Sequence, residues 1–307
     1  MKIRSKGAEG VLLTSLSALL YGTLPVFAGF AYAAGSNAET FNFYKSVWAL
    51  PVLAILLAAR KQSLLLPWRM ALWAAAAGVL GKGITSLLLY SSYNYVSSGV
   101  ATTLHFMYPL FAALLGRIVF HTRLPGYKWA TLLAATAAVC LFIDPADGRK
   151  GMIGVLCAVA SGAVYAAYIL VVDKSGASAV DPMVFAFYLA ASGAIFSLIY
   201  GVGTGTLHFF PSAEAHLYTA GAAVCTSVLG AAFFQQGIRL LGGASAAFFS
   251  LLEPVASCVF GAVFLSERVG WRAAAGILLI LASVMVMIWL DARRAGGRAG
   301  MEREKAP

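Results

Sequence analysis

The sequence is poor in charged residues. Only 11% of its 307 residues are Asp, Glu, Lys or Arg, less than half of the roughly 25% that is usual in soluble domains. Hydrophobic residues make up 61%, and the mean hydropathy is +0.83. This composition excludes a water-soluble enzyme and a disordered chain, and the alternating segments of a β-barrel would give a much lower hydropathy. It predicts an all-α integral membrane protein with many spans.

Cysteine is scarce as well, and the common catalytic motifs are missing. The four cysteines all lie in apolar runs, where a thiol behaves as a small hydrophobe, so we expect neither a disulfide nor a metal site: Cys140, Cys157, Cys225 and Cys258. Gly81-Lys82-Gly83 lacks the spacing of a phosphate-binding loop. Glu253 is the only carboxylate deep in a predicted span. We therefore expect no cofactor, no ATP hydrolysis and no enzymatic activity.

Ten apolar runs separated by short polar breaks predict ten transmembrane helices, since about 20 residues cross a bilayer. They cover residues 10–33, 40–59, 71–93, 98–119, 126–143, 151–172, 182–203, 215–238, 244–264 and 271–290. The net charge of +10 is spread over the breaks and the two ends, a distribution that sets membrane topology and does not indicate nucleic-acid binding. With the N-terminus in the cytoplasm, sixteen of the 22 Lys and Arg residues are cytoplasmic and four are external. The positive-inside rule then predicts that both termini are cytoplasmic.

The chain contains an internal repeat. An offset of 145 residues places Pro109 on Pro254, and an offset of 144 places Tyr21 on Tyr165. The repeat is five helices long, and this odd number forces the second copy to enter the membrane from the opposite side. The halves are then related by a pseudo-two-fold axis in the membrane plane. Pro109 and Pro254 are candidate hinges because a proline in mid-helix removes a hydrogen bond; alternatively, they only shape static helices.

The repeat divides the chain into four parts. We expect a cytoplasmic N-terminus over residues 1–9 and a first five-helix unit over residues 10–145. A second, inverted unit follows over residues 151–290, and a basic cytoplasmic tail over residues 291–307.

Four titratable residues fall within predicted spans, where a charge is costly and marks either a transport path or a partner: Lys45, Lys82, His105 and Glu253. Lys45 is close to the outer end of its span, so we expect its long side chain to reach the lipid headgroups. Lys82 and Glu253 lie at similar depths, roughly 14–16 Å from the membrane surface at about 1.5 Å of rise per residue. They either form a buried ion pair or face a cavity and bind the carboxylate and the ammonium group of a zwitterion.

Other residues on the same helices are candidates for substrate binding. His105 either carries a proton during the transport cycle or packs as a neutral side chain. Gln235 and Gln236 offer hydrogen bonds to a substrate or to the adjacent helix. Aromatic walls suit amphipathic solutes, and the candidates for them are Tyr21, Tyr165 and Phe249.

These features resemble the drug/metabolite transporter superfamily, EamA type: ten helices in two inverted halves, Glu253-Pro254 followed by Gly261 and Glu267, and Tyr21-Gly22 in the first helix. Within it, the chain is similar to the aromatic amino-acid exporters called YddG. The resemblance covers residues 10–290 and implies an inner-membrane exporter with a central cavity between the halves. The sequence departs from the family at Tyr21, where Trp is frequent, at Lys45, where Arg is frequent, and at Thr122, which stands opposite Glu267.

Three interpretations stay open. The first is an alternating-access exporter of aromatic and other apolar amino acids. The second is a multidrug or cationic-solute exporter of the same family. The third is a channel or a membrane sensor, although no segment resembles a selectivity filter. The expected partners are a small-molecule substrate and the lipid bilayer, without nucleic acid, and we expect a monomer.

Overall fold

The computed structural model describes residues 2–121, 125–139, 141, 148–176, 180–209, 212–241, 246 and 249–304. Over these residues, the regular secondary structure is entirely helical. Within the described ranges, eight helices are long and apolar enough to cross a membrane: Gly7–Ala33, Ala38–Ala59, Trp68–Ser92, Ser98–Val119, Lys150–Ser175, Pro182–Thr204, Ala213–Leu241 and Trp271–Leu290. Two shorter helices, α8 (Gly126–Val139) and α14 (Leu252–Phe264), occupy the remaining predicted spans. The prediction of a helical membrane protein is thereby confirmed.

Several spans are interrupted, and prolines mark most of the interruptions. The first span consists of α1 (Lys2–Gly22) and α2 (Leu24–Ala33), with Pro25 at the start of α2. The fourth consists of α6 (Ser98–His105) and α7 (Tyr108–Phe120), and Pro109 is the second residue of α7. Pro254 is the third residue of α14. The sequence analysis placed Pro109 and Pro254 in mid-helix; both instead begin a new helical segment, where a missing N–H is tolerated.

The third and eighth predicted spans are interrupted in another way. The third consists of α4 (Trp68–Gly78), the π-helical segment η1 (Val79–Ile84) and α5 (Thr85–Ser92). The eighth consists of α11 (Ala213–Ala222), the π-helical segment η5 (Ala223–Gly230) and α12 (Ala231–Leu241). π-Helical turns are rare and occur often at functional sites. Both η1 and η5 lie in the third span of their half.

Backbone irregularities follow the offset of the sequence repeat. The segment η1 begins at residue 79 and η5 at residue 223, and α7 begins at residue 108 and α14 at residue 252. Both pairs are 144 residues apart, the offset that aligns Tyr21 with Tyr165. The backbone therefore repeats together with the sequence.

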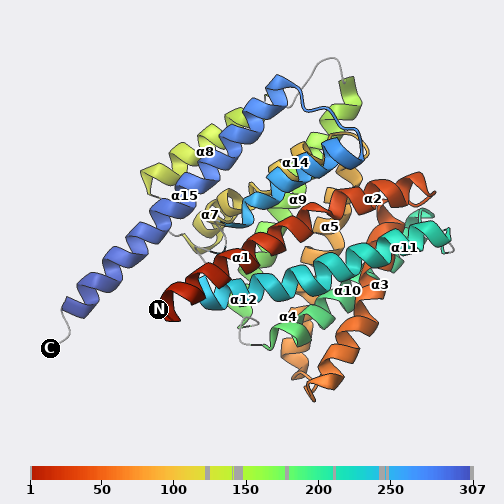
Figure 1. Ribbon diagram of the computed structural model, residues 1–307, viewed down its shortest axis with the longest axis horizontal. Coiled ribbons are helices and arrows are strands. Elements are labelled where there is room, and N and C mark those ends of the chain that lie inside the picture. The colour runs from red at the N-terminus through yellow and green to blue at the C-terminus, as the bar shows by residue number, and fades with distance from the viewer. Residues whose placement is uncertain are drawn as a thin grey trace.

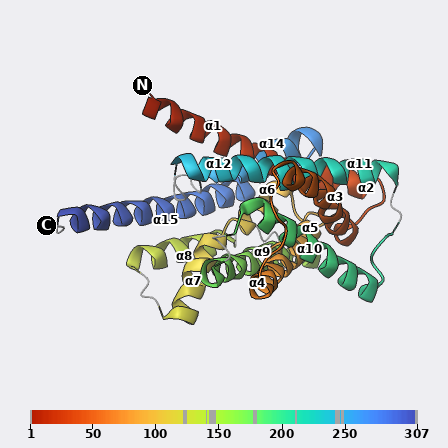
Figure 2. The same cartoon turned by 90° about the horizontal axis from the view of Figure 1, so that it is seen from below.

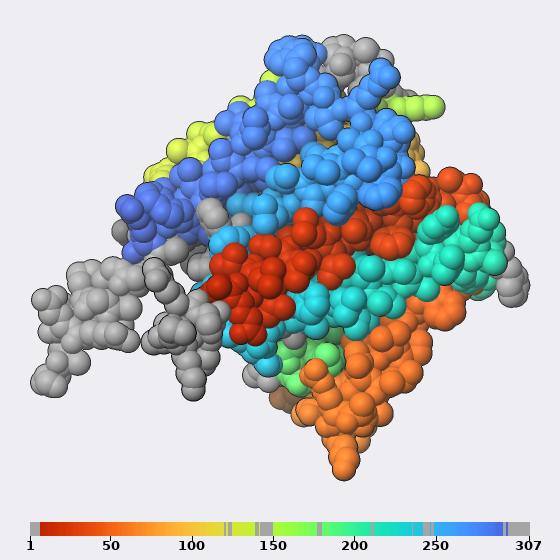
Figure 3. All heavy atoms as spheres, viewed as in Figure 1, coloured from red at the N-terminus to blue at the C-terminus, as the bar shows by residue number. Residues whose placement is uncertain are grey.

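The remaining long helices pack across the two halves. They are α3 (Ala38–Ala59), α9 (Gly148–Ser175), α10 (Pro182–Thr204) and α15 (Trp271–Glu304). On one face, α1 and α2 run alongside α12 and α11 (Figures 1 and 3). On one side of this group α15 packs on α8, and on the opposite side α3 packs on α10 (Figure 1).

The start of α1 and the end of α15 lie at the same end of the molecule, which we call the terminal end (Figures 1 and 2). The end where α2 and α11 lie is called the distal end. The helix α15 continues to Glu304, so most of the predicted basic tail is a helical extension at the terminal end.

Candidate functional site

A cavity lies between the two halves and has two compartments. The wide compartment, of about 230 Å³, is bordered by the first turns of α10 at Pro182 and Phe185. The deep compartment, of about 170 Å³, reaches Glu253 and His105. The compartments adjoin each other, because six residues line both: Tyr21, Lys45, Gly81, Lys82, Tyr165 and Phe234. Ligand pockets commonly measure about 300–1,000 Å³, so this space suits one small metabolite.

The lining of the deep compartment follows the inverted repeat. Five pairs of residues at an offset of 144 or 145 line it: Tyr21 and Tyr165, Lys82 and Thr226, Tyr90 and Phe234, His105 and Ser250, and Tyr108 and Glu253. Equivalent positions meet in this way when a pseudo-two-fold axis passes through a site. The chemistry of the pairs is nonetheless unequal, because the first half supplies a lysine and a histidine where the second supplies hydroxyl groups.

Lys45 lines the cavity, and the expectation that its side chain reaches the lipid headgroups is wrong. Its side chain does not extend to the headgroups: it is 4% exposed, its Nζ lies 5.7 Å from the centre of the Tyr90 ring, and it lines both compartments. The position of Lys45 in its predicted span indicates only how deep the residue lies along the helix axis. It carries no information on which side of α3 faces the other half.

The backbone positions both lysines. Asn42 lies three residues before Lys45 on α3, and its Nδ2 donates to the carbonyl oxygens of Lys82 at 3.0 Å and Gly83 at 3.3 Å. Carbonyl groups of η1 thus find a partner on the neighbouring helix. On the other side, a Cβ atom at Gly193 of α10 would lie 2.7 Å from Lys82 Cβ, so α10 approaches η1 closely only because residue 193 is glycine.

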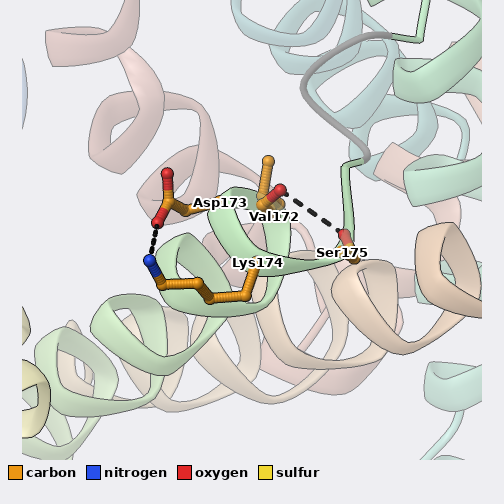
Figure 4. Close-up of polar contacts among 4 residues, drawn as sticks. All are labelled: Val172, Asp173, Lys174 and Ser175. Atoms are coloured by element: carbon orange, nitrogen blue, oxygen red, sulfur yellow. Dashed lines mark hydrogen bonds and ion pairs between the residues drawn. The ribbon is translucent and has the colours of Figure 1, made fainter. Parts of the chain in front are cut away.

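Lys82 and Glu253 line the deep compartment without forming an ion pair. Within the described residues, no nitrogen of Lys82 lies within 4.0 Å of a carboxylate oxygen of Glu253. An ion pair joins Lys174 and Asp173, at 3.1 Å, on the exposed end of α9 (Figure 4). Of the two arrangements predicted for Lys82 and Glu253, the direct ion pair is therefore absent from this conformation.

His105 ends α6 and contacts both halves of the molecule. Ser161 Oγ donates to the carbonyl oxygen of Ala158 at 2.6 Å, so its only hydrogen is used, and His105 Nδ1 must donate to Ser161 Oγ at 3.0 Å. This assignment from the hydrogen-bond network leaves Nε2 of a neutral ring as an acceptor. The ring centre lies 5.2 Å from that of Tyr165 and 5.9 Å from that of Tyr108. His105 is thus both a packed side chain and a polar group of the deep compartment.

The remaining candidates lie elsewhere. Gln236 is exposed and lines a separate hollow of about 90 Å³ at the terminal end, together with Arg60, Asp181 and Arg239. This hollow and the wide compartment share Pro182. Phe249 is half-buried and is not among the described residues that line either compartment. The side chain of Gln235 lies outside the described part of the chain.

Towards the distal end, the cavity stops at the apolar core. Leu24, Leu89 and Phe106 line the deep compartment and also belong to the main core cluster. Beyond them, three hydrogen bonds join the α2–α3 loop and the first turn of α3 to the segment between α10 and α11. They are Asn37 Nδ2 to Thr206 O at 2.6 Å, His208 N to Thr40 Oγ1 at 2.9 Å and Ser212 Oγ to Ala34 O at 2.8 Å. The cavity therefore approaches the terminal end and is separated from the distal end.

Glu267 adds a further contact between the halves on the distal side. Its carboxylate accepts hydrogen bonds from Ser98 N at 2.9 and 3.1 Å and from Ser98 Oγ at 2.7 Å. The carboxylate thus satisfies the backbone N–H at the start of α6, where an anion is favoured. A Cβ atom at Gly261 would lie 2.3 Å from Glu267 Oε2, so a glycine at that position makes room for this contact.

Comparison with known proteins supports a transporter. An uncharacterized transporter of Bacillus subtilis (strain 168), YcbK, is 26% identical over 288 residues, which cover 88% of this chain and 89% of the relative. An uncharacterized transporter of Archaeoglobus fulgidus is 23% identical over 282 residues, which cover 90% and 98%. A crystal structure with 19% identity shares the fold at a TM-score of 0.62, over 93% of this chain and 98% of that one.

The family comparison covers both halves. The sequence pattern of the EamA-like transporter family matches residues 8–143 and again residues 152–289. Proteins of this kind carry small solutes across a lipid bilayer, in agreement with the apolar helices and the central cavity described above. The chain therefore belongs to the EamA-like transporter family.

Proposed function

We propose that this multi-pass transporter of small solutes exports aromatic and other apolar amino acids across the cytoplasmic, or inner, membrane. It works by alternating access, as a monomer of ten spans with both termini in the cytoplasm. The terminal end then faces the cytoplasm, and the conformation described here offers its cavity to that side.

The observation that carries this proposal is the composition of the deep compartment. Lys82 comes from one half and Glu253 from the other, and tyrosines from both halves line the same compartment. A zwitterion with an aromatic or aliphatic side chain needs a cation, an anion and an apolar wall, and such walls with a few placed polar groups are typical of small-molecule sites. A substrate that contacts both halves also favours the conformation in which the halves close around it.

The mechanism follows from the same geometry. The substrate enters from the terminal end, its carboxylate binds Lys82, and its ammonium group binds Glu253. The halves then rock about the breaks at Pro109 and Pro254, where the chain already changes direction. Export requires that the distal hydrogen bonds, including those of Glu267, break. Whether a proton moves with the substrate depends on His105 and Glu253.

A second candidate, an exporter of cationic drugs, has less support. Two lysines line the cavity, so a cation meets repulsion there, and the compartments are small for drug-sized ligands. A channel is disfavoured because the core residues Leu24, Leu89 and Phe106 separate the cavity from the distal end.

The test is counterflow of labelled phenylalanine into liposomes that hold the purified protein. Saturable counterflow that Lys82→Ala abolishes, and that Lys174→Ala leaves intact, supports the proposal. Lys174 is a matched control because its ion pair with Asp173 lies on an exposed helix end (Figure 4). Flux that rises linearly with concentration indicates a channel. Saturable counterflow of a labelled cationic solute, with none of phenylalanine, supports the second candidate.

A further inference from the structure

Two lysines and one carboxylate share the cavity, and their charges do not cancel. Lys45 and Lys82 line both compartments, and Glu253 lines the deep one. Within the described residues, no Asp or Glu oxygen lies within 4.0 Å of the amino group of either lysine. His105, whose Nδ1 donates to Ser161 Oγ, adds no charge when its ring is neutral. With all three side chains ionised, the empty cavity therefore has a net charge of +1.

Both lysines are positioned at the same cavity by contacts that are independent of any ligand. Asn42 ties the backbone of Lys82 to α3, one turn before Lys45. Glycines at positions 81 and 193 let Tyr168 and α10 pack closely around Lys82. Lys45 is 4% exposed, and the nearest aromatic contact of its Nζ is the Tyr90 ring. Two like charges in a space with little water repel each other unless an anion lies between them.

A further polar group of the same compartment lacks a partner. Thr85 Oγ1 is buried and makes no hydrogen bond within the described structure, and Thr85 lines the deep compartment with Lys45 and Lys82. Buried hydroxyl groups are ordinarily hydrogen-bonded. An anionic oxygen placed in the deep compartment supplies the missing acceptor.

We infer that the essential feature of the substrate is a carboxylate bound jointly by Lys45 and Lys82, and that its amino group is dispensable. The best-matched substrates are amphipathic monocarboxylates of net charge −1, such as aromatic 2-hydroxy or 2-oxo acids, which neutralise the cavity. An aromatic amino acid, of net charge zero, binds but leaves one positive charge. This inference rests on the proposed function, since it concerns the same cavity, and it narrows the substrate to a chemical class.

The test compares three solutes that share a phenyl ring and differ in charge: 3-phenyllactate, phenylalanine and phenethylamine. Their binding to the purified protein is measured by isothermal titration calorimetry, and their exchange by counterflow in liposomes. We expect 3-phenyllactate to bind at least as tightly as phenylalanine, and phenethylamine to bind at least about tenfold more weakly than either. Phenethylamine binding as tightly as phenylalanine, or phenylalanine binding without 3-phenyllactate, overturns the inference.

Variants of Lys45 and Lys82 test whether these two residues bind the carboxylate of 3-phenyllactate. Lys45→Gln and Lys82→Gln should each weaken 3-phenyllactate binding about tenfold or more, since each removes a charge-assisted hydrogen bond, while Lys174→Gln should change nothing. Lys45→Arg keeps the charge and should retain most of the affinity, which guards against a variant that fails to fold. If Lys45→Gln folds and binds 3-phenyllactate normally, the joint site is refuted.

The outcomes also separate this inference from the proposed function. Counterflow of 3-phenyllactate without counterflow of phenylalanine refutes amino-acid export and leaves the carboxylate site intact. Counterflow of phenylalanine without binding of 3-phenyllactate refutes the carboxylate site and leaves amino-acid export intact. Binding of none of the three solutes refutes both.

Discussion

Replacing Gly193 with alanine adds one carbon atom where α10 packs on η1. The new Cβ would lie 2.7 Å from Lys82 Cβ and 3.4 Å from the Lys82 carbonyl carbon. A shift of Lys82 away from α10 would strain the hydrogen bond that Asn42 donates to its carbonyl oxygen. Overpacking of this kind costs about 1–3 kcal/mol. Since Lys82 lines the cavity, we also expect a raised KM for the transported solute.

Gly203 provides a matched control in the same helix. A Cβ atom at this position meets nothing within 4 Å, so Gly203→Ala has only the effect of replacing glycine in a helix, a gain of up to about 1 kcal/mol. Gly193→Ala has a similar gain in helix stability. The difference in unfolding free energy between the two variants therefore reports the overpacking alone, and we expect Gly203→Ala to be more stable by about 1–3 kcal/mol.

Thermal unfolding of both variants in detergent measures this difference, and counterflow in liposomes measures the effect on KM. We expect Gly193→Ala to have a Tm several degrees below that of Gly203→Ala. Equal Tm values with unchanged transport would refute the close packing of α10 on η1 as well as the fixed position of Lys82.

Three further predictions concern other contacts of the site. Glu267→Ala removes the carboxylate that accepts from Ser98 N and leaves Ser98 Oγ with the carbonyl oxygen of Ser257 as its acceptor. A hydrogen bond to a charged group contributes about 1.5–3 kcal/mol, so the distal side should open more often. A cysteine at position 24 in a cysteine-free background should then react faster with an impermeant thiol reagent applied externally. Pro109→Ala and Pro254→Ala should lower the turnover number while the dissociation constant from calorimetry changes little, and a change confined to the dissociation constant would contradict a hinge role. Asn42→Leu should lower the Tm by an amount equivalent to about 1–3 kcal/mol, because buried partners lose their hydrogen bonds; an unchanged Tm would show that η1 does not depend on this amide.

Much of the architecture could be predicted because hydropathy and repetition determine it. Apolar runs mark spans since the bilayer accepts only helices with satisfied backbones, and the EamA family expected from Tyr21-Gly22, Glu253-Pro254 and the inverted repeat is confirmed. The π-helical segments could not be predicted in this way. A single additional residue in a turn leaves a hydropathy profile unchanged, and only the backbone hydrogen bonds reveal it.

The candidate site was harder to predict because hydropathy gives depth but not direction. For Lys82 and Glu253, depth and sequence neighbours suggested a cavity, and in the structure both line one. For Lys45, the same argument failed because depth does not say which side of α3 faces the partner half. In the structure, Leu189, which the offset of 144 aligns with Lys45, lines the wide compartment as well.

The matching positions of η1 and η5 also indicate how the two halves arose. A π-helical turn arises from the insertion of one residue into an α-helix, a change that costs stability and persists only where it is useful. Two such insertions at corresponding places, 144 residues apart, are accounted for by one insertion in an ancestral five-helix protein, before its gene was duplicated and fused. The ionisable residues differ between the halves, since Lys82 corresponds to Thr226 and Glu253 corresponds to Tyr108. The two halves thus share the widened turns but not the charged side chains, and relatives with different solutes are expected to keep the two turns while exchanging the side chains on them.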